Sequence, residues 1–254
     1  MLIENTTKRK LQKGEAVFGC FFRQADPTLA EFVALQGWDF LVFDGEHGSL
    51  EARDIEGLVR AGELHGVTPI ARVPANEPHV ILRFLDAGAH GVHVPWVNTV
   101  EGVEQAVTAA KYGPRGLRGL AGSRQGGWGS KESLADFTAR ANRETMVIVH
   151  IETAAAAAVV EEYTAVDDVD VLFIGPTDLS HSLGHPGNPG HPEVVKVMEQ
   201  VAEVVTASDK MLGIFAGSPG FAEEWHKRGA RYFTAGFEGV VKQGMQTYLT
   251  AVRG

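Results

Sequence analysis

The strongest constraint on the fold is a regular alternation of short apolar runs with longer amphipathic segments. The runs recur about every 30 residues, and each is followed by a stretch of helical periodicity. Strands that alternate with helices in this way form a parallel sheet with right-handed crossovers. Eight units within 254 residues predict an α/β fold, a (β/α)8 TIM barrel rather than an open doubly wound sheet. The expected strands are residues 16–22, 40–43, 69–73, 91–96, 146–152, 171–175, 212–216 and 232–235. An alanine-rich helix is expected after the fifth strand, to about residue 163, and a long loop over residues 179–192 after the sixth. We interpret the histidines of that loop, His181, His185 and His191, as surface residues rather than a second metal site, because their spacing does not match a helical zinc motif.

The segments between these strands leave no room for a second folded unit. No low-complexity linker interrupts the alternation, so we expect residues 1–254 to form one domain. Residues 1–14 are a polar lead-in, and the last helix is expected at about residues 240–252. Neither a G-x-G-x-x-G motif after the first strand nor a G-x-x-x-x-G-K-[ST] motif occurs, which leaves a nucleotide-binding fold without support.

Charge and cysteine content argue against several classes of protein. The formal net charge of -9 disfavours unspecific binding to nucleic acid or to an anionic membrane. Cys20 is the only cysteine, so an internal disulfide is impossible, and we interpret it as a buried strand residue. The polar start of the chain does not resemble a secretory signal. We therefore expect a cytoplasmic protein.

Two acidic side chains follow two successive buried strands. Glu152 ends the apolar run at 146–152, and Asp178 follows the run at 171–175 after a glycine and a proline. A carboxylate in the core is costly, whereas a carboxylate at the carboxyl end of a barrel strand lies where active sites form. Two such hard oxygen ligands are suited to one divalent cation. The sequence therefore predicts a metal site made by Glu152 and Asp178.

Other strands end in ionisable residues as well. The second strand is followed by Asp44, Glu46 and His47, and the third ends in Arg72. Because the carboxyl ends of all barrel strands share one rim, these groups are expected to face the same site as the two acids.

Six ordered motifs carry a resemblance to a known family. Between about residues 19 and 239 the sequence is similar to the HpcH/HpaI family, the metal-dependent (class II) pyruvate aldolases. The motifs are Phe43-Asp-Gly-Glu-His47, Ala71-Arg-Val-Pro74, Leu85-Asp-Ala-Gly88, Arg115-Gly-Leu-Arg-Gly119, His150-Ile-Glu-Thr153 and Phe173-Ile-Gly-Pro-Thr-Asp-Leu-Ser180.

The resemblance implies reversible cleavage of 4-hydroxy-2-oxo acids to pyruvate, or a related 2-oxo acid, and an aldehyde. Glu152 and Asp178 would hold Mg²⁺ or Mn²⁺, with Co²⁺ or Zn²⁺ as further options, and the ion would stabilise the enolate. Arg72 would bind the keto oxygen or the carboxylate of the oxo acid; its alternative is a structural ion pair.

The resemblance also implies an acid/base group and its partner. His47 would carry the proton, because an imidazole titrates near neutral pH; metal-bound water is the alternative base. Asp86 matches the position of the residue that orients this histidine, and in the family that partner can come across a subunit interface. Asp44 is a local alternative, and Glu46 is expected to assist by hydrogen bonding only.

The substrate is expected to meet the turn at Gly175, Pro176 and Thr177, beside Asp178, with Phe215 limiting the length of the acceptor. His150 departs from the family pattern, which usually has glutamine two residues before the metal-binding glutamate. We expect its imidazole to bond the keto oxygen or, less favoured, to ligate the metal. Arg118 and Arg124 are candidates to contact an anionic acceptor or to be solvated loop residues.

Two other functions compete with the aldolase. One is a metal-dependent decarboxylase of a 2-oxo acid, or another lyase that forms an enolate. The other is a barrel that only binds an oxo acid. A Schiff-base aldolase is disfavoured, since no lysine falls at an expected strand end. By family resemblance the chain would form homo-oligomers, hexamers built as dimers of trimers, with the last helix exchanged between subunits. Neither nucleic acid nor a membrane is expected as a partner.

Overall fold

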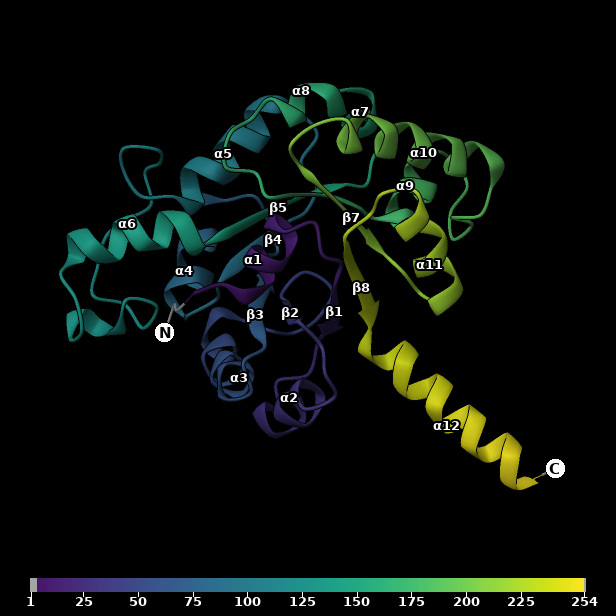
Figure 1. The fold of residues 1–254 in the computed structure, drawn as a ribbon, viewed down its shortest axis with the longest axis horizontal. Coiled ribbons are helices and arrows are strands. Elements are labelled where there is room, and N and C mark those ends of the chain that lie inside the picture. The colour runs from purple at the N-terminus through teal and green to yellow at the C-terminus, as the bar shows by residue number, and fades with distance from the viewer. Residues whose placement is uncertain (1–3, 254) are drawn as a thin grey trace.

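The computed structural model describes residues 4–253 and shows a closed barrel of eight parallel strands, in the order of the sequence (Figure 1). This confirms the predicted TIM barrel. Residues 1–3 of the predicted lead-in, and residue 254, lie outside the described part. The strands are β1 (Val17–Phe22), β2 (Phe40–Asp44), β3 (Thr68–Arg72), β4 (Gly91–Val94), β5 (Met146–Ile151), β6 (Val171–Ile174), β7 (Met211–Phe215) and β8 (Tyr232–Gly236).

Helices surround this barrel, and several begin at the sequence signals that start helices. Proline occupies the first helical position of α2, α4, α10 and α11, where its missing N–H is not needed. The helices are α1 (Thr6–Gln12), α2 (Pro27–Ala34), α3 (Ala52–Leu64), α4 (Pro78–Asp86), α5 (Val100–Ala110), α6 (Leu134–Glu144), α7 (Ala154–Ala158), α8 (Val160–Thr164), α9 (Pro176–Ser182), α10 (Pro192–Thr206), α11 (Pro219–Lys227) and α12 (Phe237–Arg253), with one short 3₁₀ turn at Gly127–Gly129.

Alternate residues of each strand fill the inside of the barrel. The inner cluster includes Phe21, Phe40, Ile148, Phe173 and Tyr232, and the intervening residues pack outward against the helices in a larger cluster. Leu11 of α1 joins the inner cluster, so this helix closes the amino end of the barrel. The carboxyl end is left open for a site.

Three differences from the predicted elements have local causes. The lead-in contains α1, which begins where Asn5 accepts a hydrogen bond from the amide of Lys8. The predicted loop after the sixth strand begins with α9, because Pro176 and Asp178 provide a helix start. The alanine-rich helix is two short helices that meet at Val159.

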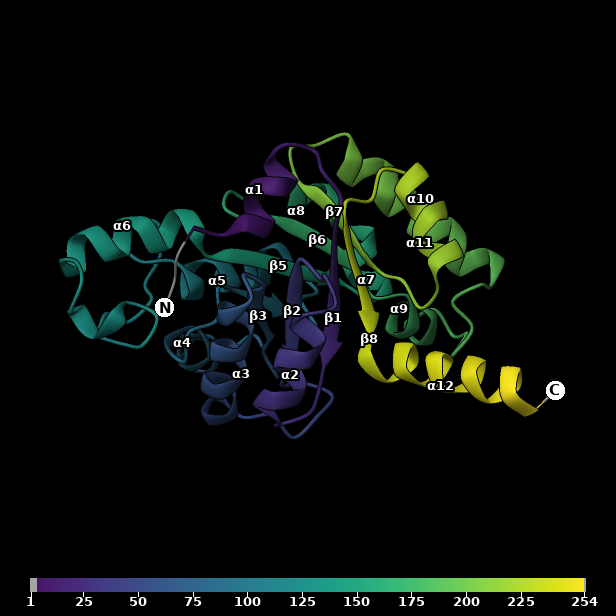
Figure 2. The ribbon, with the colours of Figure 1, turned by 60° about the horizontal axis from the view of Figure 1, so that its bottom comes forward.

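The last helix leaves the body of the barrel. Helix α12 has no buried residue and extends away from the strands in both views (Figures 1 and 2). Its exposed apolar side chains are Val240, Met245, Tyr248, Leu249 and Val252. Among residues 4–253, no helix has the length and apolar character that a membrane span requires.

Candidate active site

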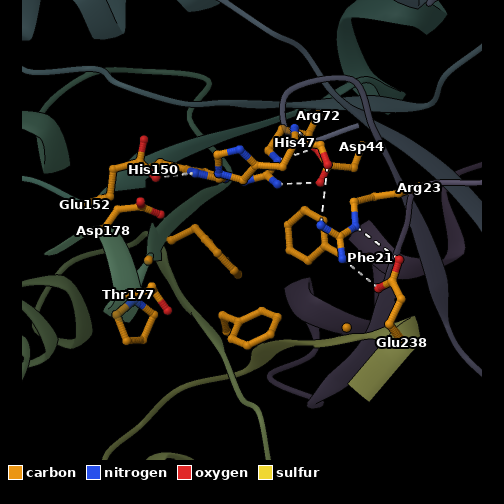
Figure 3. A pocket seen from close by; sticks show the side chains of 15 residues that line it. Phe21, Arg23, Asp44, His47, Arg72, His150, Glu152, Thr177, Asp178 and Glu238 are labelled. Carbon is orange, nitrogen blue, oxygen red and sulfur yellow. Dashed lines mark hydrogen bonds and ion pairs between the residues drawn. The ribbon is translucent and has the colours of Figure 1, made fainter. Parts of the chain in front are cut away.

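A cavity of about 260 Å³ opens at the carboxyl ends of the strands (Figure 3). Of the predicted site residues, Asp86 and the further candidates Glu46, Arg118 and Arg124 do not line it, and all the others do. The lining residues are Phe21, Arg23, Asp44, His47, Arg72, His150, Glu152, Phe173, Gly175, Pro176, Thr177, Asp178, Phe215, Gly236 and Glu238.

Strand alternation explains why the charged residues meet here. Side chains two residues apart share one face of a strand, so Ile148, His150 and Glu152 all point toward the barrel axis. Asp44 and Arg72 are register partners at the ends of β2 and β3 and face the same way. The sequence therefore places four polar groups, His150, Glu152, Asp44 and Arg72, at the mouth of an otherwise apolar barrel.

Glu152 is held from two sides. Its Oε1 accepts a hydrogen bond from the amide of Trp96 at 2.6 Å, and its Oε2 lies 3.0 Å from Nδ1 of His150. Trp96 adopts a left-handed φ of 55°, a strained conformation that accompanies this contact. Burial raises the pKa of Glu152, but the charge and hydrogen bond of His150 and the amide of Trp96 bring this pKa below its usual value. The carboxylate is therefore ionised at neutral pH.

Asp178 supplies a second carboxylate beside the first. It lies in the first turn of α9 and is half-buried, and it makes no hydrogen bond or ion pair within residues 4–253. The turn before it is close to Glu152, since a Cβ atom at Gly175 would lie 3.1 Å from the Glu152 Cβ and 3.2 Å from its Oε2. Figure 3 shows both acids on the same side of the cavity.

This donor set fits a divalent cation. Two carboxylates, one ionised and the other without a partner in the described chain, offer the hard oxygen atoms that Mg²⁺ and Mn²⁺ bind, with room for water or substrate in the cavity.

A cation of the protein lies across the cavity. The guanidinium of Arg72 donates to both carboxylate oxygens of Asp44, and its Nη1 lies 2.9 Å from Oε2 of Glu46. It also stacks over the ring of Phe21 at 4.7 Å. Burial raises the pKa of Asp44, but the hydrogen bonds and charge of Arg72, together with the amides of His47 and Glu46, lower this pKa overall. Burial raises the pKa of Glu46 to about 6, aided by the charge of Glu152 and opposed by Arg72.

His47 reaches the cavity from the loop after β2. Its backbone amide donates to Oδ1 of Asp44 at 3.1 Å, which fixes the loop, while its exposed imidazole makes no hydrogen bond within the described chain. The ring is therefore free to exchange a proton with a molecule in the cavity.

Comparison with known proteins identifies the family. The family model described as HpcH/HpaI aldolase/citrate lyase matches residues 17–243. The chain belongs to this family. It is 33% identical over 243 residues to the 5-keto-4-deoxy-D-glucarate aldolases of Shigella boydii and Escherichia coli, which covers 95% of this chain and 94% of each relative.

Solved structures of HpcH/HpaI proteins agree with this assignment. A family member from Burkholderia cenocepacia superposes with a TM-score of 0.93 at 33% identity, over 98% of this chain and all of the other. An HpcH/HpaI aldolase from Desulfitobacterium hafniense gives 0.89 at 28% identity, over 97% and 96% of the two chains. The citrate synthase SbnG gives 0.86 at 30% identity with the same coverage.

The family's aspartate position is remote from the cavity within one chain. Asp86 is the last residue of α4, which runs back toward the amino end of the barrel, and its Oδ1 accepts from Arg118 at 2.6 Å. Arg124 pairs with Glu63 at 2.8 Å, so neither arginine lines the cavity. Contact of Asp86 with His47 across a subunit interface stays a prediction, whereas Asp44 already contacts the His47 backbone.

His150 faces the cavity with both ring nitrogens engaged. Nδ1 contacts Glu152, and Nε2 lies 2.9 Å from Nδ1 of His93. Binding to a keto oxygen or a metal, the two predicted roles, would require one of these contacts to break.

Four residues near the site were absent from the sequence-based expectation. Arg23 and Glu238 form an ion pair of 3.0 Å at the rim, and His93 and Tyr232 lie below His150. A histidine inside the apolar run 91–94 is the signal for the inner pair, because a polar group in a barrel interior needs a partner.

A second group of possible metal ligands lies outside this cavity. The ligand atoms of His185, His191 and Glu193 lie within 4.8 Å of one another. However, the two rings are stacked 3.5 Å apart at 17°, so their lone pairs do not converge, and His191 Nδ1 accepts the Glu193 amide. This agrees with the prediction of a surface loop.

Proposed function

We propose that the chain is a divalent-metal-dependent aldolase that reversibly cleaves 4-hydroxy-2-oxo acids to pyruvate, or a related 2-oxo acid, and an aldehyde. The observation that carries the proposal is the pair of carboxylates, Glu152 and Asp178, on one cavity with the guanidinium of Arg72. The 33% identity to 5-keto-4-deoxy-D-glucarate aldolases supports carbon–carbon lyase chemistry. Mg²⁺ or Mn²⁺ is the proposed ion.

The ion, when bound by Glu152 and Asp178, would act as a Lewis acid toward the oxo acid. The chain's own residues bind and orient that substrate. Arg72, fixed by Asp44, presents the N–H groups that the carboxylate leaves unused. The amide of Thr177, at the start of α9, is the proposed donor to the substrate carboxylate, whereas the amide of Gly175 donates to the carbonyl of Ile151 at 3.1 Å.

Other residues that line the cavity are proposed to transfer the proton and to exclude water. His47 is the proposed proton carrier, because its imidazole is exposed at the cavity and an imidazole can both accept and donate a proton. Phe21, Phe173 and Phe215 form an apolar wall that excludes water from the bound oxo acid.

A coupled assay tests the proposed reaction. Pyruvate release is measured with lactate dehydrogenase on a panel of 4-hydroxy-2-oxo acids, including 5-keto-4-deoxy-D-glucarate, after chelation and with Mg²⁺ or Mn²⁺ restored. We expect metal-dependent release of pyruvate and aldehyde in equal amounts. Release of neither product from any panel member would refute the aldolase.

A second candidate is another carbon–carbon reaction of a 2-oxo acid, such as decarboxylation. One similar solved structure is a citrate synthase at 30% identity, so the fold hosts more than one such reaction. Metal-dependent loss of oxaloacetate without release of aldehyde from any 4-hydroxy-2-oxo acid would favour this candidate.

The proposed assembly is a homo-oligomer in which α12 packs on a second copy, in a hexamer built as a dimer of trimers. The support is the unburied helix and, at its base, an apolar groove of about 790 Å³ lined by Phe18, Trp38, Phe233 and Val240 among others. Replacing Leu249 by Asp should dissociate the oligomer in sedimentation measurements. A cytoplasmic location also stays a prediction.

A further inference from the structure

Four polar side chains form a continuous buried chain beneath the cavity. Glu152 Oε2 lies 3.0 Å from His150 Nδ1, His150 Nε2 lies 2.9 Å from His93 Nδ1, and His93 Nε2 lies 2.7 Å from the hydroxyl of Tyr232. The residues are 2%, 1%, 0% and 0% exposed, so water does not compete for these contacts. The chain crosses the barrel interior from β5 through β4 to β8.

Each contact in this hydrogen-bond chain joins one donor to one acceptor. The Glu152 carboxylate accepts from Nδ1 of His150. Between His150 Nε2 and His93 Nδ1 one nitrogen donates and the other accepts, and the same holds between His93 Nε2 and the hydroxyl of Tyr232. Both ring nitrogens of both histidines are therefore occupied, whichever tautomers the two rings adopt.

Packing holds the two imidazoles in these orientations. The ring of His93 makes edge contacts with Phe21 and Phe173, with centroids 5.5 and 5.1 Å apart. The ring of His150 lies 5.0 Å from that of Phe173. Ring flips would have to displace these neighbours, so hydrogen bonding and packing select the same arrangement.

These contacts leave His150 with neither an N–H nor a lone pair for a molecule in the cavity. Its one remaining contact with the site is Glu152, whose other oxygen is held by the amide of Trp96. The carboxylate is therefore fixed at both oxygens, and the lone pairs not used by these donors face the cavity. Groups that orient a ligand in this way preserve affinity for a metal without touching it.

We propose that His93 and Tyr232 are positioning residues, which act through His150 to hold the Glu152 carboxylate in the orientation that binds the divalent ion. The role in ion binding rests on the metal site of the proposed function; the hydrogen-bond chain itself stands on the distances and burial of its four members.

The test removes the hydroxyl oxygen of Tyr232, at the end of the hydrogen-bond chain farthest from Glu152. Tyr232→Phe keeps the ring, which stacks on Phe40 at 4.3 Å, and deletes only the hydroxyl. Two properties are measured in the full-length protein: the ¹⁵N shifts of His93 and His150 without metal, and the affinity for Mn²⁺ by titration. In the variant we expect the His93 pattern to change and Mn²⁺ to bind about tenfold more weakly, the lower end of the range for such orienting groups.

Tyr163→Phe is the matched control. Tyr163 is also fully buried. Its hydroxyl donates a hydrogen bond of 3.1 Å to the carbonyl of Val97, which is not a member of the four-residue hydrogen-bond chain. The control should lose a similar amount of thermal stability and keep the wild-type affinity for Mn²⁺. Asp178→Ala serves as the reference for loss of the ion itself.

Three results would overturn the proposal. The first is a ¹⁵N pattern of His93 that is the same in Tyr232→Phe as in the wild type. The second is wild-type Mn²⁺ affinity in Tyr232→Phe, and the third is an equal loss of affinity in Tyr163→Phe. If the wild type itself binds no Mn²⁺, the metal site of the proposed function fails together with the role in ion binding. In that case the ¹⁵N pattern alone still decides whether the hydrogen-bond chain of Glu152, His150, His93 and Tyr232 exists.

Discussion

Arg72 and Asp44 are joined by two parallel hydrogen bonds, from Nε to Oδ1 at 2.8 Å and from Nη2 to Oδ2 at 2.5 Å. They are register partners on β3 and β2, so the backbone ladder and the side-chain pair reinforce each other. The plane of the guanidinium is thereby fixed, and Asp44 stays ionised because Arg72 lowers its pKa. Arg72 is therefore a preorganised donor rather than a mobile charge.

Replacement of Arg72 by Lys should reduce kcat/KM for the hydroxy-oxo acid by about 100-fold or more. An ammonium group cannot make the bidentate ion pair with Asp44 and also reach the substrate. Steady-state kinetics measures this loss, and Mn²⁺ titration should show little change. Arg60→Lys, on the exposed face of α3, is the control. Near wild-type kcat/KM in Arg72→Lys would contradict the assigned role.

Removal of Asp178 should abolish tight binding of the ion. This carboxylate makes no hydrogen bond or ion pair within residues 4–253, so Asp178→Ala should leave the fold intact while it removes a ligand. The affinity for Mn²⁺ should fall more than about 100-fold, beyond the range for orienting groups. Calorimetric titration measures it, and Asp209→Ala, whose side chain is 82% exposed, is the control. Unchanged affinity in Asp178→Ala would place the ion elsewhere.

His47→Ala should slow turnover by about 10²- to 10⁴-fold, the usual contribution of a general acid or base, without weakening the binding of Mn²⁺ or pyruvate. The imidazole makes no hydrogen bond within the described chain, so little stability should be lost. Single-turnover kinetics separates this effect from product release. His79→Ala, exposed on α4, is the comparison; normal turnover in His47→Ala would assign proton transfer to another group.

Lys111 should give the stability a distinctive pH dependence. Burial lowers its pKa from 10.5 to about 8, although its ammonium donates to the carbonyls of Asn142 and Thr145. Between pH 8 and 10.5 the unfolded chain therefore binds more protons, so this group makes the free energy of unfolding rise with pH. Denaturant titrations of Lys111→Met should lack this rise, while Lys13→Met, an exposed substitution, should retain it. Parallel curves for wild type and Lys111→Met would contradict the lowered pKa.

Periodicity predicted the barrel because each strand is a local pattern. All eight expected strands overlap the observed ones, and the same alternation explains why Glu152 and Arg72 line the cavity. The prediction of a loop after the sixth strand was wrong at α9, where the start signal was present but the helix has only seven residues.

Contacts across the barrel were beyond the reach of the sequence. The pairing of His93 with Tyr232 joins residues 139 positions apart, which depends on how the closed sheet brings opposite strands together. In the same way, the family resemblance assigns Asp86 to the site, whereas within one chain the direction of α4 carries it toward the other end of the barrel and into a pair with Arg118.

Phe215 should control the length of the aldehyde. It ends β7, contacts Phe21 at 6.2 Å between ring centroids, and has its Cζ 3.7 Å from the position of a Cβ at Gly236, so its ring closes one side of the cavity. Phe215→Ala should raise kcat/KM for long acceptors relative to glyceraldehyde-sized ones by about tenfold, the value of one or two methylene groups in a pocket. The ratio is measured in the condensation direction with pyruvate and a homologous series of aldehydes. Phe32→Ala, 60% exposed on α2, should leave the ratio unchanged, and an unchanged ratio in Phe215→Ala would place the acceptor against another wall.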